Sequence, residues 1–456
     1  MGINFDFAKR FAADKLIEQA LKYLEKDPEA NFLKLLDIGE KLVGRDNHKQ
    51  VILTAKKNYR TSPILKGYIR KINDIAHSYK SGLLMNFFVN SALFGIPYQY
   101  KLAEKLGVAV PWTILIDPTS ACNLNCDGCW AGKYNKSDSL DFATIDRIIT
   151  EAKELGIYFI VLSGGEPTVY PALFDIINKH DDVGFMMYTN GTLIDDNFAD
   201  KMLAAGNITP AISLEGFKET TDARRGKGTF EQVMATMDRL RARGIIFGSS
   251  VTVTRNNVDE LFSDQFIDLM IEKGAFYMWS FHYIPIGRTS DINLMLKPEQ
   301  RYQLAKKVTD LRNSKQLFVA DFWNDSAYTN GCIAGGKRYF HINAKGEAEP
   351  CAFCHFACDN IKDKSLKEIL QNPLFKSYQQ RQPFAENLMC PCPIIDNPQA
   401  LRNMVEESGA YPTHQGAEDI LKGELAQSLD QIACIWRKMS QEINSERLRK
   451  KISLKQ

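Results

Sequence analysis

Short apolar runs alternate with helical patterns through the middle of the chain. The predicted strands cover residues 112–116, 158–162, 185–188, 208–213, 246–254 and 277–283. Apolar positions recur at helical spacing between them, over residues 142–155, 171–180, 195–205, 229–243 and 258–273. Several of these patterns end at a glycine, as helices commonly do. Six successive β/α units predict an α/β fold with a parallel sheet, and ligands of such sheets bind at the carboxyl ends of the strands.

The N-terminal part, residues 1–110, has only helical patterns, one of which begins with an Asp27 cap and a first-turn Pro28. Its most apolar stretch, residues 82–97, is shorter than the roughly 20 residues of a spanning helix. Two interpretations remain open for that stretch. We favour a helix packed on the barrel, and the alternative is an interfacial helix in peripheral contact with a membrane.

Beyond residue 290 we expect the alternation to stop. A cysteine-rich segment follows, and the chain then ends in a polar helical region. We therefore divide the chain into a helical domain (1–110), an α/β domain (111–290), a cysteine-rich domain (291–400) and a helical extension (401–456).

Composition narrows the possible partners and the compartment. The 456 residues contain 57 Lys and Arg against 55 Asp and Glu, so a net charge of +2 gives no sign of nucleic-acid binding. Ten cysteines are too few for a disulfide scaffold of this length, and the N-terminus lacks the basic and apolar regions of a signal peptide. A reducing cytoplasm is the expected location.

Three of the cysteines, Cys122, Cys126 and Cys129, stand in C-x3-C-x2-C spacing directly after the first predicted strand. Structural zinc sites use four protein ligands, and a fully ligated [4Fe–4S] cluster uses four cysteines. Three thiols in one loop therefore leave one iron of such a cluster open for another ligand.

A second motif ends the next strand, where Gly164, Gly165 and Glu166 precede Pro167. Glycines let a backbone approach a ligand closely, and the glutamate adds a carboxylate at the same edge of the sheet. The following strands end in Thr189-Asn190-Gly191 and Ser213-Leu214-Glu215-Gly216, and Arg224-Arg225-Gly226 comes after them. These strand ends are expected to surround one site.

The three-cysteine loop followed by Gly-Gly-Glu-Pro resembles the signature of the radical S-adenosylmethionine (SAM) superfamily. The resemblance implies a partial (β/α)6 barrel in which Cys122, Cys126 and Cys129 hold a [4Fe–4S] cluster and SAM takes the open iron. Reductive cleavage of SAM would give a 5′-deoxyadenosyl radical that abstracts hydrogen from a substrate. The implied SAM contacts are Gly164, Gly165, Glu166, Asn190, Ser213 and Arg225, with Arg224 as the alternative arginine.

One position departs from that signature. The residue before the third cysteine is usually aromatic and lies near the adenine, whereas this chain has Gly128 there and an aromatic Trp130 on the other side of Cys129. Contact with adenine through residue 128 would be limited to its backbone.

The C-terminal cysteines form a second group. Residues 332–351 have C-x13-G-x4-C spacing, and the segment around Gly346 is typical of a hairpin that brings Cys332 and Cys351 together. This resembles SPASM and Twitch domains, which implies an auxiliary [4Fe–4S] cluster. We expect Cys332, Cys351 and Cys392 as ligands, with a fourth from Cys390, Cys354 or Cys358 or from the substrate. A zinc site is the alternative, and Cys434 is expected to be a buried apolar residue.

The resemblance predicts an enzyme and leaves its substrate open. Radical SAM enzymes with this extension mostly modify peptides or proteins, and lipids are the alternative substrate class. A non-catalytic iron–sulfur electron carrier is a competing function, although such a carrier has no use for the motif at residues 163–167. A reductant protein of the flavodoxin or ferredoxin type and a low-oxygen setting are the further expectations.

Overall fold

One mixed sheet forms the centre of the molecule. The computed structural model describes residues 7–42 and 46–445, and its nine-stranded sheet has the order β7-β6-β5-β4-β3-β2-β1-β8-β9. Every neighbouring pair is parallel except β8 and β9. The strands are β1 (Thr113–Ile116), β2 (Phe159–Leu162), β3 (Gly184–Thr189), β4 (Ile208–Leu214), β5 (Gly248–Val253), β6 (Tyr277–His282), β7 (Phe318–Asp321), β8 (Tyr339–Ile342) and β9 (Ala348–Glu349).

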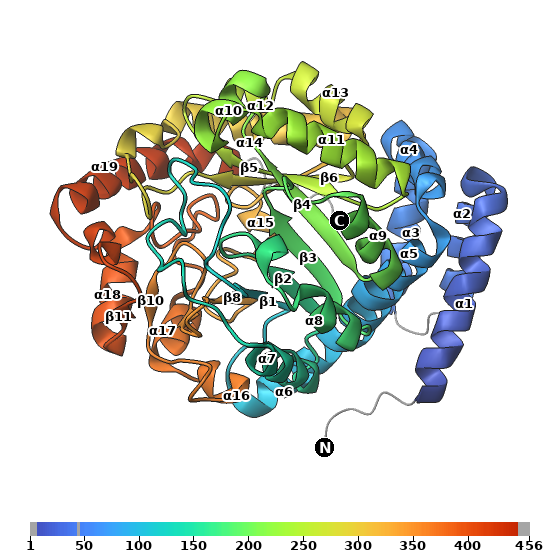
Figure 1. Ribbon diagram of the computed structural model, residues 1–456, viewed down its shortest axis with the longest axis horizontal. Helices are drawn as coiled ribbons and strands as arrows, with labels where there is room; N and C mark the ends of the chain where they lie inside the picture. Colours follow the sequence, from blue (N-terminus) through green and yellow to red (C-terminus); the bar gives the residue numbers. More distant parts are fainter. Residues whose placement is uncertain (1–6, 43–45, 446–456) are drawn as a thin grey trace.

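Helices connect the parallel strands along the outside of the sheet (Figure 1). They are α7 (Phe142–Glu154), η3 (Pro167–Val169), α8 (Leu173–Lys179), α9 (Asp196–Ala205), α10 (Lys218–Arg225), α11 (Thr229–Ala242), α12 (Val258–Leu261), α13 (Asp264–Lys273), η4 (Ile292–Leu294) and α14 (Pro298–Ser314). Side-chain caps fix several starts: Asp141 accepts a hydrogen bond from the amide of Thr144 at 2.7 Å, and Asp195 accepts one from Phe198 at 2.7 Å.

The six predicted strands are confirmed as β1 to β6, and the α/β fold with them. The expectation that the alternation stops at residue 290 is wrong, because α14 leads into β7, which pairs in parallel with β6. The run of β7, Phe-Val-Ala-Asp, ends in a buried aspartate that interrupts its apolar pattern, whereas the equally short β1 and β2 are apolar to their last residue. The opposite edge is extended as well, since β8 pairs in parallel with β1.

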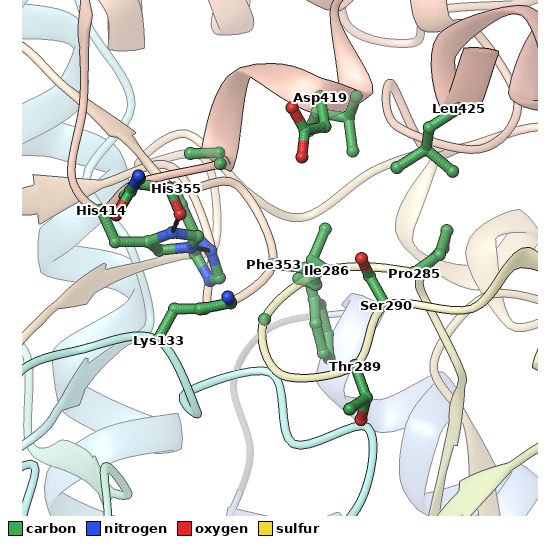
Figure 2. Close-up of a pocket in the computed structure, with 15 residues that line it drawn as sticks. Lys133, Pro285, Ile286, Thr289, Ser290, Phe353, His355, His414, Asp419 and Leu425 are labelled. Atoms are coloured by element: carbon green, nitrogen blue, oxygen red, sulfur yellow. Dashed lines mark hydrogen bonds between the residues drawn. The ribbon is translucent and has the colours of Figure 1, made fainter. Parts of the chain in front are cut away.

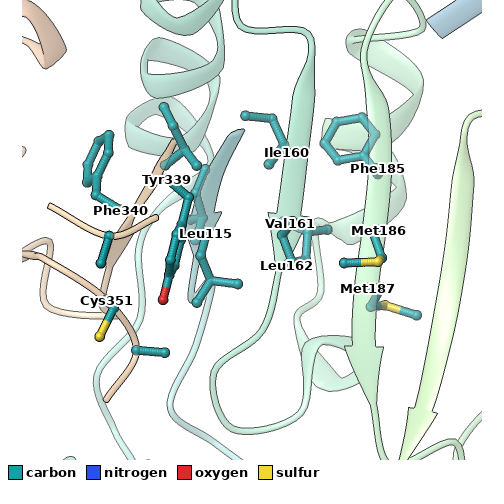
Figure 3. Packing of buried hydrophobic residues seen from close by; sticks show 14 of the residues in the cluster. Leu115, Ile160, Val161, Leu162, Phe185, Met186, Met187, Tyr339, Phe340 and Cys351 are labelled. Carbon is teal, nitrogen blue, oxygen red and sulfur yellow. The ribbon is translucent and has the colours of Figure 1, made fainter. Parts of the chain in front are cut away.

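Apolar side chains from neighbouring strands fill the sheet layers. Figure 3 shows Leu115, Val161, Met186 and Tyr339 among the packed side chains of β1, β2, β3 and β8. The same continuous core reaches Cys351 at the end of the β8–β9 hairpin. The cysteine-rich segment is therefore packed on the barrel core rather than beside it.

The N-terminal helices lie at the end of the sheet where the strands begin. They are α1 (Phe7–Lys26), α2 (Pro28–Leu42), α3 (Asp46–Thr61), α4 (Pro63–Lys71), η1 (Ile72–Asp74), α5 (His77–Leu83), the π-helix η2 (Leu84–Gly95) and α6 (Ile96–Leu106). The predicted cap is present, with the amide of Ala30 donating to Asp27 at 3.1 Å.

The apolar stretch 82–97 packs on the barrel, which confirms the favoured interpretation. In η2, Asn86 and Asn90 donate side-chain hydrogen bonds of 2.8 and 3.0 Å to the carbonyls of Asp181 and Asp182, just before β3. A Cβ on Gly95 would lie 2.5 Å from the carbonyl oxygen of Gly156, just before β2. No helix in residues 7–42 and 46–445 combines the length and apolar character that crossing a bilayer requires.

The C-terminal part begins with the predicted hairpin. β8 and β9 pair antiparallel around Gly346, whose φ of 94° is left-handed, as the turn requires. The remaining elements are α15 (Ser326–Thr329), β10 (Phe356–Ala357), α16 (Leu366–Ile369), α17 (Pro373–Arg381), α18 (Pro398–Ser408), β11 (Tyr411–Pro412), η5 (Ala417–Ile420) and α19 (Gly423–Met439).

Candidate active site

The three-cysteine loop leaves the carboxyl end of β1. Cys122, Cys126 and Cys129 are all half-buried in it. Burial raises the pKa of the Cys122 and Cys126 thiols, and for Cys126 the nearby guanidinium of Arg225 opposes that rise. The loop thus presents three thiols at the edge of the sheet where ligands of parallel sheets bind.

Two glycines after β2 let the cysteine loop lie directly on the neighbouring strand end. A Cβ on Gly165 would stand 2.0 Å from the carbonyl oxygen of Ala121, and one on Gly164 2.5 Å from that of Thr119. The amide of Gly165 donates to Thr119 at 2.9 Å. We expected a ligand to approach these glycines, and the structure shows the cysteine loop's own backbone against them. Their contact with SAM stays a prediction.

Glu166 is buried and joins the ends of β2 and β3. Its Oε1 accepts hydrogen bonds from the Thr189 hydroxyl at 2.6 Å and from the amide and hydroxyl of Thr168. Its Oε2 accepts one from the amide of Asn190 at 2.7 Å, which leaves one lone pair of that oxygen for a further donor. Burial raises the pKa of this carboxyl group. A bound ammonium group would stabilise its charged form.

Asn190 ties the end of β3 to the cysteine loop. Its Nδ2 donates to Asn123 at 2.8 Å, and its Oδ1 accepts from the amide of Thr192 at 2.9 Å. Ser213 is half-buried near the end of β4, and its hydroxyl makes no hydrogen bond within the described part of the chain. That hydroxyl is therefore available to a ligand, as is the remaining lone pair of Glu166 Oε2.

The adjacent residues Arg224 and Arg225 share one partner and differ in their other contacts. Both contact the buried Glu215, with Arg224 Nη1 at 2.5 Å and Arg225 Nη2 at 2.6 Å from its Oε1. Arg225 also points a nitrogen to 3.9 Å from the sulfur of Cys126. Arg224 donates instead to the backbone carbonyls of Asp127 and Gly128. Two cations on one carboxylate leave a net positive charge beside the thiols, which suits thiolate ligands.

Gly128, which departs from the family signature, sits against an aromatic ring from another strand end. Its φ is 64°, and a Cβ there would lie 2.9 Å from the ring of Tyr283, the residue after β6. A side chain at residue 128 would displace that ring. No sequence pattern indicates this contact, because residues 128 and 283 are far apart in the chain.

Four C-terminal thiols lie near one another. Cys332, Cys351 and Cys392 line one small hollow, and Cys354 follows Cys351 in a tight turn, with its amide donating to the Cys351 carbonyl at 3.0 Å. Each of these thiols lies within electrostatic range of others in the set. Burial raises the pKa of Cys332 to about 11 and of Cys392 to about 12. Iron binding at these thiols must therefore release protons.

The other cysteines lie apart from this set. The sulfur of Cys390 is 3.5 Å from the Ser440 hydroxyl in a separate apolar cluster, and Cys358 is 3.6 Å from the carbonyl of Ser408. Of the three possible fourth ligands, the geometry therefore favours Cys354. Cys434 is exposed, so the prediction that it is buried is wrong, because α19 turns that position outward.

Both thiol sets fit an iron–sulfur cluster better than a single metal ion. A [4Fe–4S] cluster places each cysteine on a different iron, so its ligands stand farther apart than those around one zinc ion. Among the side chains that the structure describes, no three from His, Cys, Asp or Glu are close enough to hold one ion together. Cysteine thiolates are the ligands of such clusters, and the two sets contain three and four thiols.

A buried ionic network connects the two thiol sites. His341 on β8 lies 2.9 Å from Asp117 at the end of β1 and 2.7 Å from Glu349 on β9, and the Tyr134 hydroxyl donates to Glu349 at 2.8 Å. Burial alone would lower the pKa of His341, but the two carboxylates raise it to about 10. Burial raises the pKa of Asp117 and the histidine lowers that of Glu349, so Glu349 is the firmer counter-ion.

No sequence pattern predicts this network. The one feature that indicates a buried polar contact is His341, which stands between Phe340 and Ile342 in an otherwise apolar strand. Another unpredicted pair, His355 and His414, borders a pocket near the cysteine loop.

Figure 2 shows that pocket, which has a volume of about 460 Å³, with residues that line it. One wall is the loop after β6, residues 285–290, in which the amide of Arg288 donates to the Cys129 carbonyl at 3.0 Å. The facing wall is the segment 414–425. Phe353 borders this pocket and also the hollow lined by the auxiliary thiols. A molecule in the pocket would therefore lie close to both cysteine sets.

Comparison with known proteins agrees with this geometry. The sequence pattern described as the radical SAM superfamily matches residues 116–263, and that of an iron–sulfur cluster-binding SPASM domain matches residues 332–393. The mycofactocin maturase MftC of Mycolicibacterium smegmatis is 33% identical over 304 residues, which are 62% of this chain and 76% of that protein. An AdoMet-dependent heme synthase of Methanosarcina barkeri is 27% identical over 58% of this chain and 82% of the relative.

Solved structures show the same fold at low identity. Streptococcus suis SuiB bound to S-adenosylmethionine has a TM-score of 0.55 and 17% identity, covering 65% of this chain and 75% of that one. SuiB bound to its precursor peptide SuiA has a TM-score of 0.54 and 18% identity, covering 62% and 70%.

The fold and the two matched segments define an iron–sulfur enzyme of the SAM-dependent radical class with an auxiliary cluster-binding domain. The chain belongs to the radical SAM superfamily and carries a C-terminal SPASM domain. Its cofactors are SAM and [4Fe–4S] clusters.

Proposed function

We propose that the protein modifies a peptide or protein by abstracting a hydrogen atom from it. The proposal is supported by the pocket beside the two cysteine sets, where a bound substrate would lie close to both. Support for the substrate class comes from relatives named as peptide-modifying enzymes, a PqqA peptide cyclase of Ruegeria pomeroyi among them. When bound, the reduced cluster at the three-cysteine loop supplies the electron that cleaves SAM.

The residues of this chain would hold and orient SAM. Cys122, Cys126 and Cys129 would ligate three irons. Glu166 has a free lone pair for an ammonium group, and the Ser213 hydroxyl is available to a carboxylate or ribose. Arg225 sits beside Cys126, where its charge would stabilise the cluster's thiolates. At the second site Cys332, Cys351, Cys354 and Cys392 would ligate the auxiliary cluster.

A lipid substrate is the second candidate, and one observation bears on it. Leu84, Phe88 and Leu93 of η2 are exposed apolar side chains. They lie at the end of the barrel where the strands begin, whereas the pocket lies at the opposite end. This position favours a peripheral membrane contact over a lipid entrance to the site. Delivery of electrons by a flavodoxin- or ferredoxin-type protein in a reducing, low-oxygen cytoplasm completes the proposal.

The deciding experiment measures 5′-deoxyadenosine formed by anaerobically reconstituted protein with SAM and a strong reductant. A peptide-and-protein extract of the source cells is compared with a detergent-solubilised lipid extract and with no addition. We expect stimulation by the peptide extract, and none with Cys122→Ala. Stimulation by the lipid extract alone would contradict the proposed substrate class. If SAM is never cleaved and Cys122→Ala behaves like the parent, an electron carrier replaces the enzyme.

A further inference from the structure

Two basic side chains lie on the same side of the pocket beside the two cysteine sets. Lys133, from the segment after the cysteine loop, and His414, from the segment after β11, both line it, and Figure 2 shows the two side chains next to each other. His414 is half-buried, and the lysine is exposed to the pocket opening. Neither residue belongs to the predicted cofactor sets.

Hydrogen bonds hold the ring of His414 beside the lysine. Nδ1 of His414 lies 2.9 Å from the Gln415 carbonyl, and a carbonyl only accepts, so this nitrogen donates. Its Nε2 faces Nδ1 of His355, whose Nε2 in turn donates to the Ala352 carbonyl at 2.9 Å. The ring of His414 is therefore fixed at both nitrogens at the wall of the pocket, next to the charge of Lys133.

The rest of the pocket combines polar and apolar groups, with one acid across from Lys133 and His414. Ile286, Phe353 and Leu425 contribute apolar surface, and Asp419 stands on the far side from His414 in Figure 2. This distribution suits a ligand with a single negative charge attached to apolar surface. A polyanion such as a nucleotide triphosphate would place charge against Asp419. The volume of about 460 Å³ is within the range of small-ligand pockets, and it suits one or two amino-acid side chains.

We propose that Lys133 and His414 recognise a carboxylate of the substrate in this pocket. The inference rests on the proposed function and specifies its substrate: the modified peptide presents an acidic side chain or its C-terminal carboxylate beside an apolar group. The wall that carries His414 lies after residue 393, outside both segments that match known families. Lys133 lies within the segment that matches the radical SAM superfamily, so the proposed carboxylate site joins that segment to a part of the chain outside both matches.

Direct binding tests this without turnover. Reconstituted protein, without SAM or reductant, is titrated into four dansyl-labelled tripeptides: one with a free C-terminus, its C-terminal amide, and two amidated peptides with an internal glutamate or glutamine. We expect one carboxylate peptide to bind about tenfold more tightly than its neutral partner. Which pair shows the difference distinguishes a C-terminal from a side-chain carboxylate.

Variants assign the effect to the pocket. Lys133→Gln and His414→Gln should each remove most of the tenfold difference, whereas Lys136→Gln, in the same segment but outside the pocket, should retain it. Asp419→Asn should tighten binding of the carboxylate peptide. Equal binding of charged and neutral peptides, or equal losses at Lys133 and Lys136, would overturn the inference. Because SAM is absent, this result is independent of whether SAM is cleaved, so failure here and failure of the proposed function are distinguishable.

Discussion

The two cysteine sites differ in how the chain positions their thiols. The thiols of Cys122, Cys126 and Cys129 come from one loop and are half-buried. The auxiliary thiols come from the segments before β8, after β9 and after α17, and Cys351, Cys354 and Cys392 are buried. The spacing of the first three cysteines is set within one loop. That loop is contacted by the ends of β2 and β3 and by two arginines. The second site exists only when distant segments have packed.

Because of this difference, we expect substitutions at the first site to affect catalysis and substitutions at the second site to affect stability as well. A half-exposed thiol in a loop contributes little to the core, so its removal should affect the cofactor and leave the fold intact. The auxiliary thiols are part of the continuous hydrophobic core, and their segment is joined to the barrel through the β1–β8 pairing. Loss of that cluster should affect both the substrate site and the fold.

The largest expected effect is at the local site. Cys122→Ala should abolish 5′-deoxyadenosine formation, because a cluster with two protein ligands cannot be held in place for SAM. The melting temperature of the protein without cofactor should stay within the error of the parent's, since the thiol is half-buried. Activity is measured by chromatography and stability by calorimetry. A large fall in the melting temperature would contradict the separation between the two sites.

A second substitution tests the fourth auxiliary ligand. Cys354→Ala should lower bound iron from about eight to about four atoms per chain, because only the three-cysteine cluster remains. Cys358→Ala and Cys390→Ala are the matched controls and should keep the parent's iron content. Iron and sulfide analysis with Mössbauer spectroscopy distinguishes the cases. If Cys390→Ala is the one variant of the three that loses iron, the fourth ligand is Cys390 and not Cys354.

The sequence predicted the local site better than the distributed one for a physical reason. The spacing of the cysteine loop and Gly165 after β2 are sequence-local, and six strands could be placed because each apolar run lies between patterned helices. The choice among Cys354, Cys358 and Cys390 depends on which thiol faces the hollow after folding. No periodicity encodes that choice, and none encodes the pairing of β8 with β1.

The third prediction compares the adjacent arginines. Arg225→Gln removes the guanidinium 3.9 Å from the Cys126 sulfur, and we expect SAM cleavage to fall by about 10- to 100-fold, as for other residues that support metal ligands. Arg224→Gln should cause a smaller loss, because that side chain contacts backbone carbonyls of the loop. The kcat for 5′-deoxyadenosine formation measures both. If kcat falls more in Arg224→Gln than in Arg225→Gln, then Arg224 and not Arg225 is the arginine that supports the cluster ligands.

The smallest effect concerns the histidine that joins the two regions. His341 has a folded-state pKa of about 10, above the ordinary value of 6.5, because it lies between Asp117 and Glu349. Its charge therefore stabilises the fold fully below pH 6.5, and this contribution is lost as the pH rises towards 10. We expect the free energy of unfolding in urea to fall by on the order of a few kcal/mol between pH 7 and 10.

The matched variant is His341→Gln, which keeps a hydrogen-bonding side chain but cannot titrate. It should be less stable than the parent at pH 7, because Glu349 then lacks its buried counter-ion, and its unfolding free energy should change less between pH 7 and 10. A parent and variant with the same pH dependence would mean that His341 is neutral in the folded protein. The link between the two cysteine sites would then be a hydrogen bond rather than an ion pair.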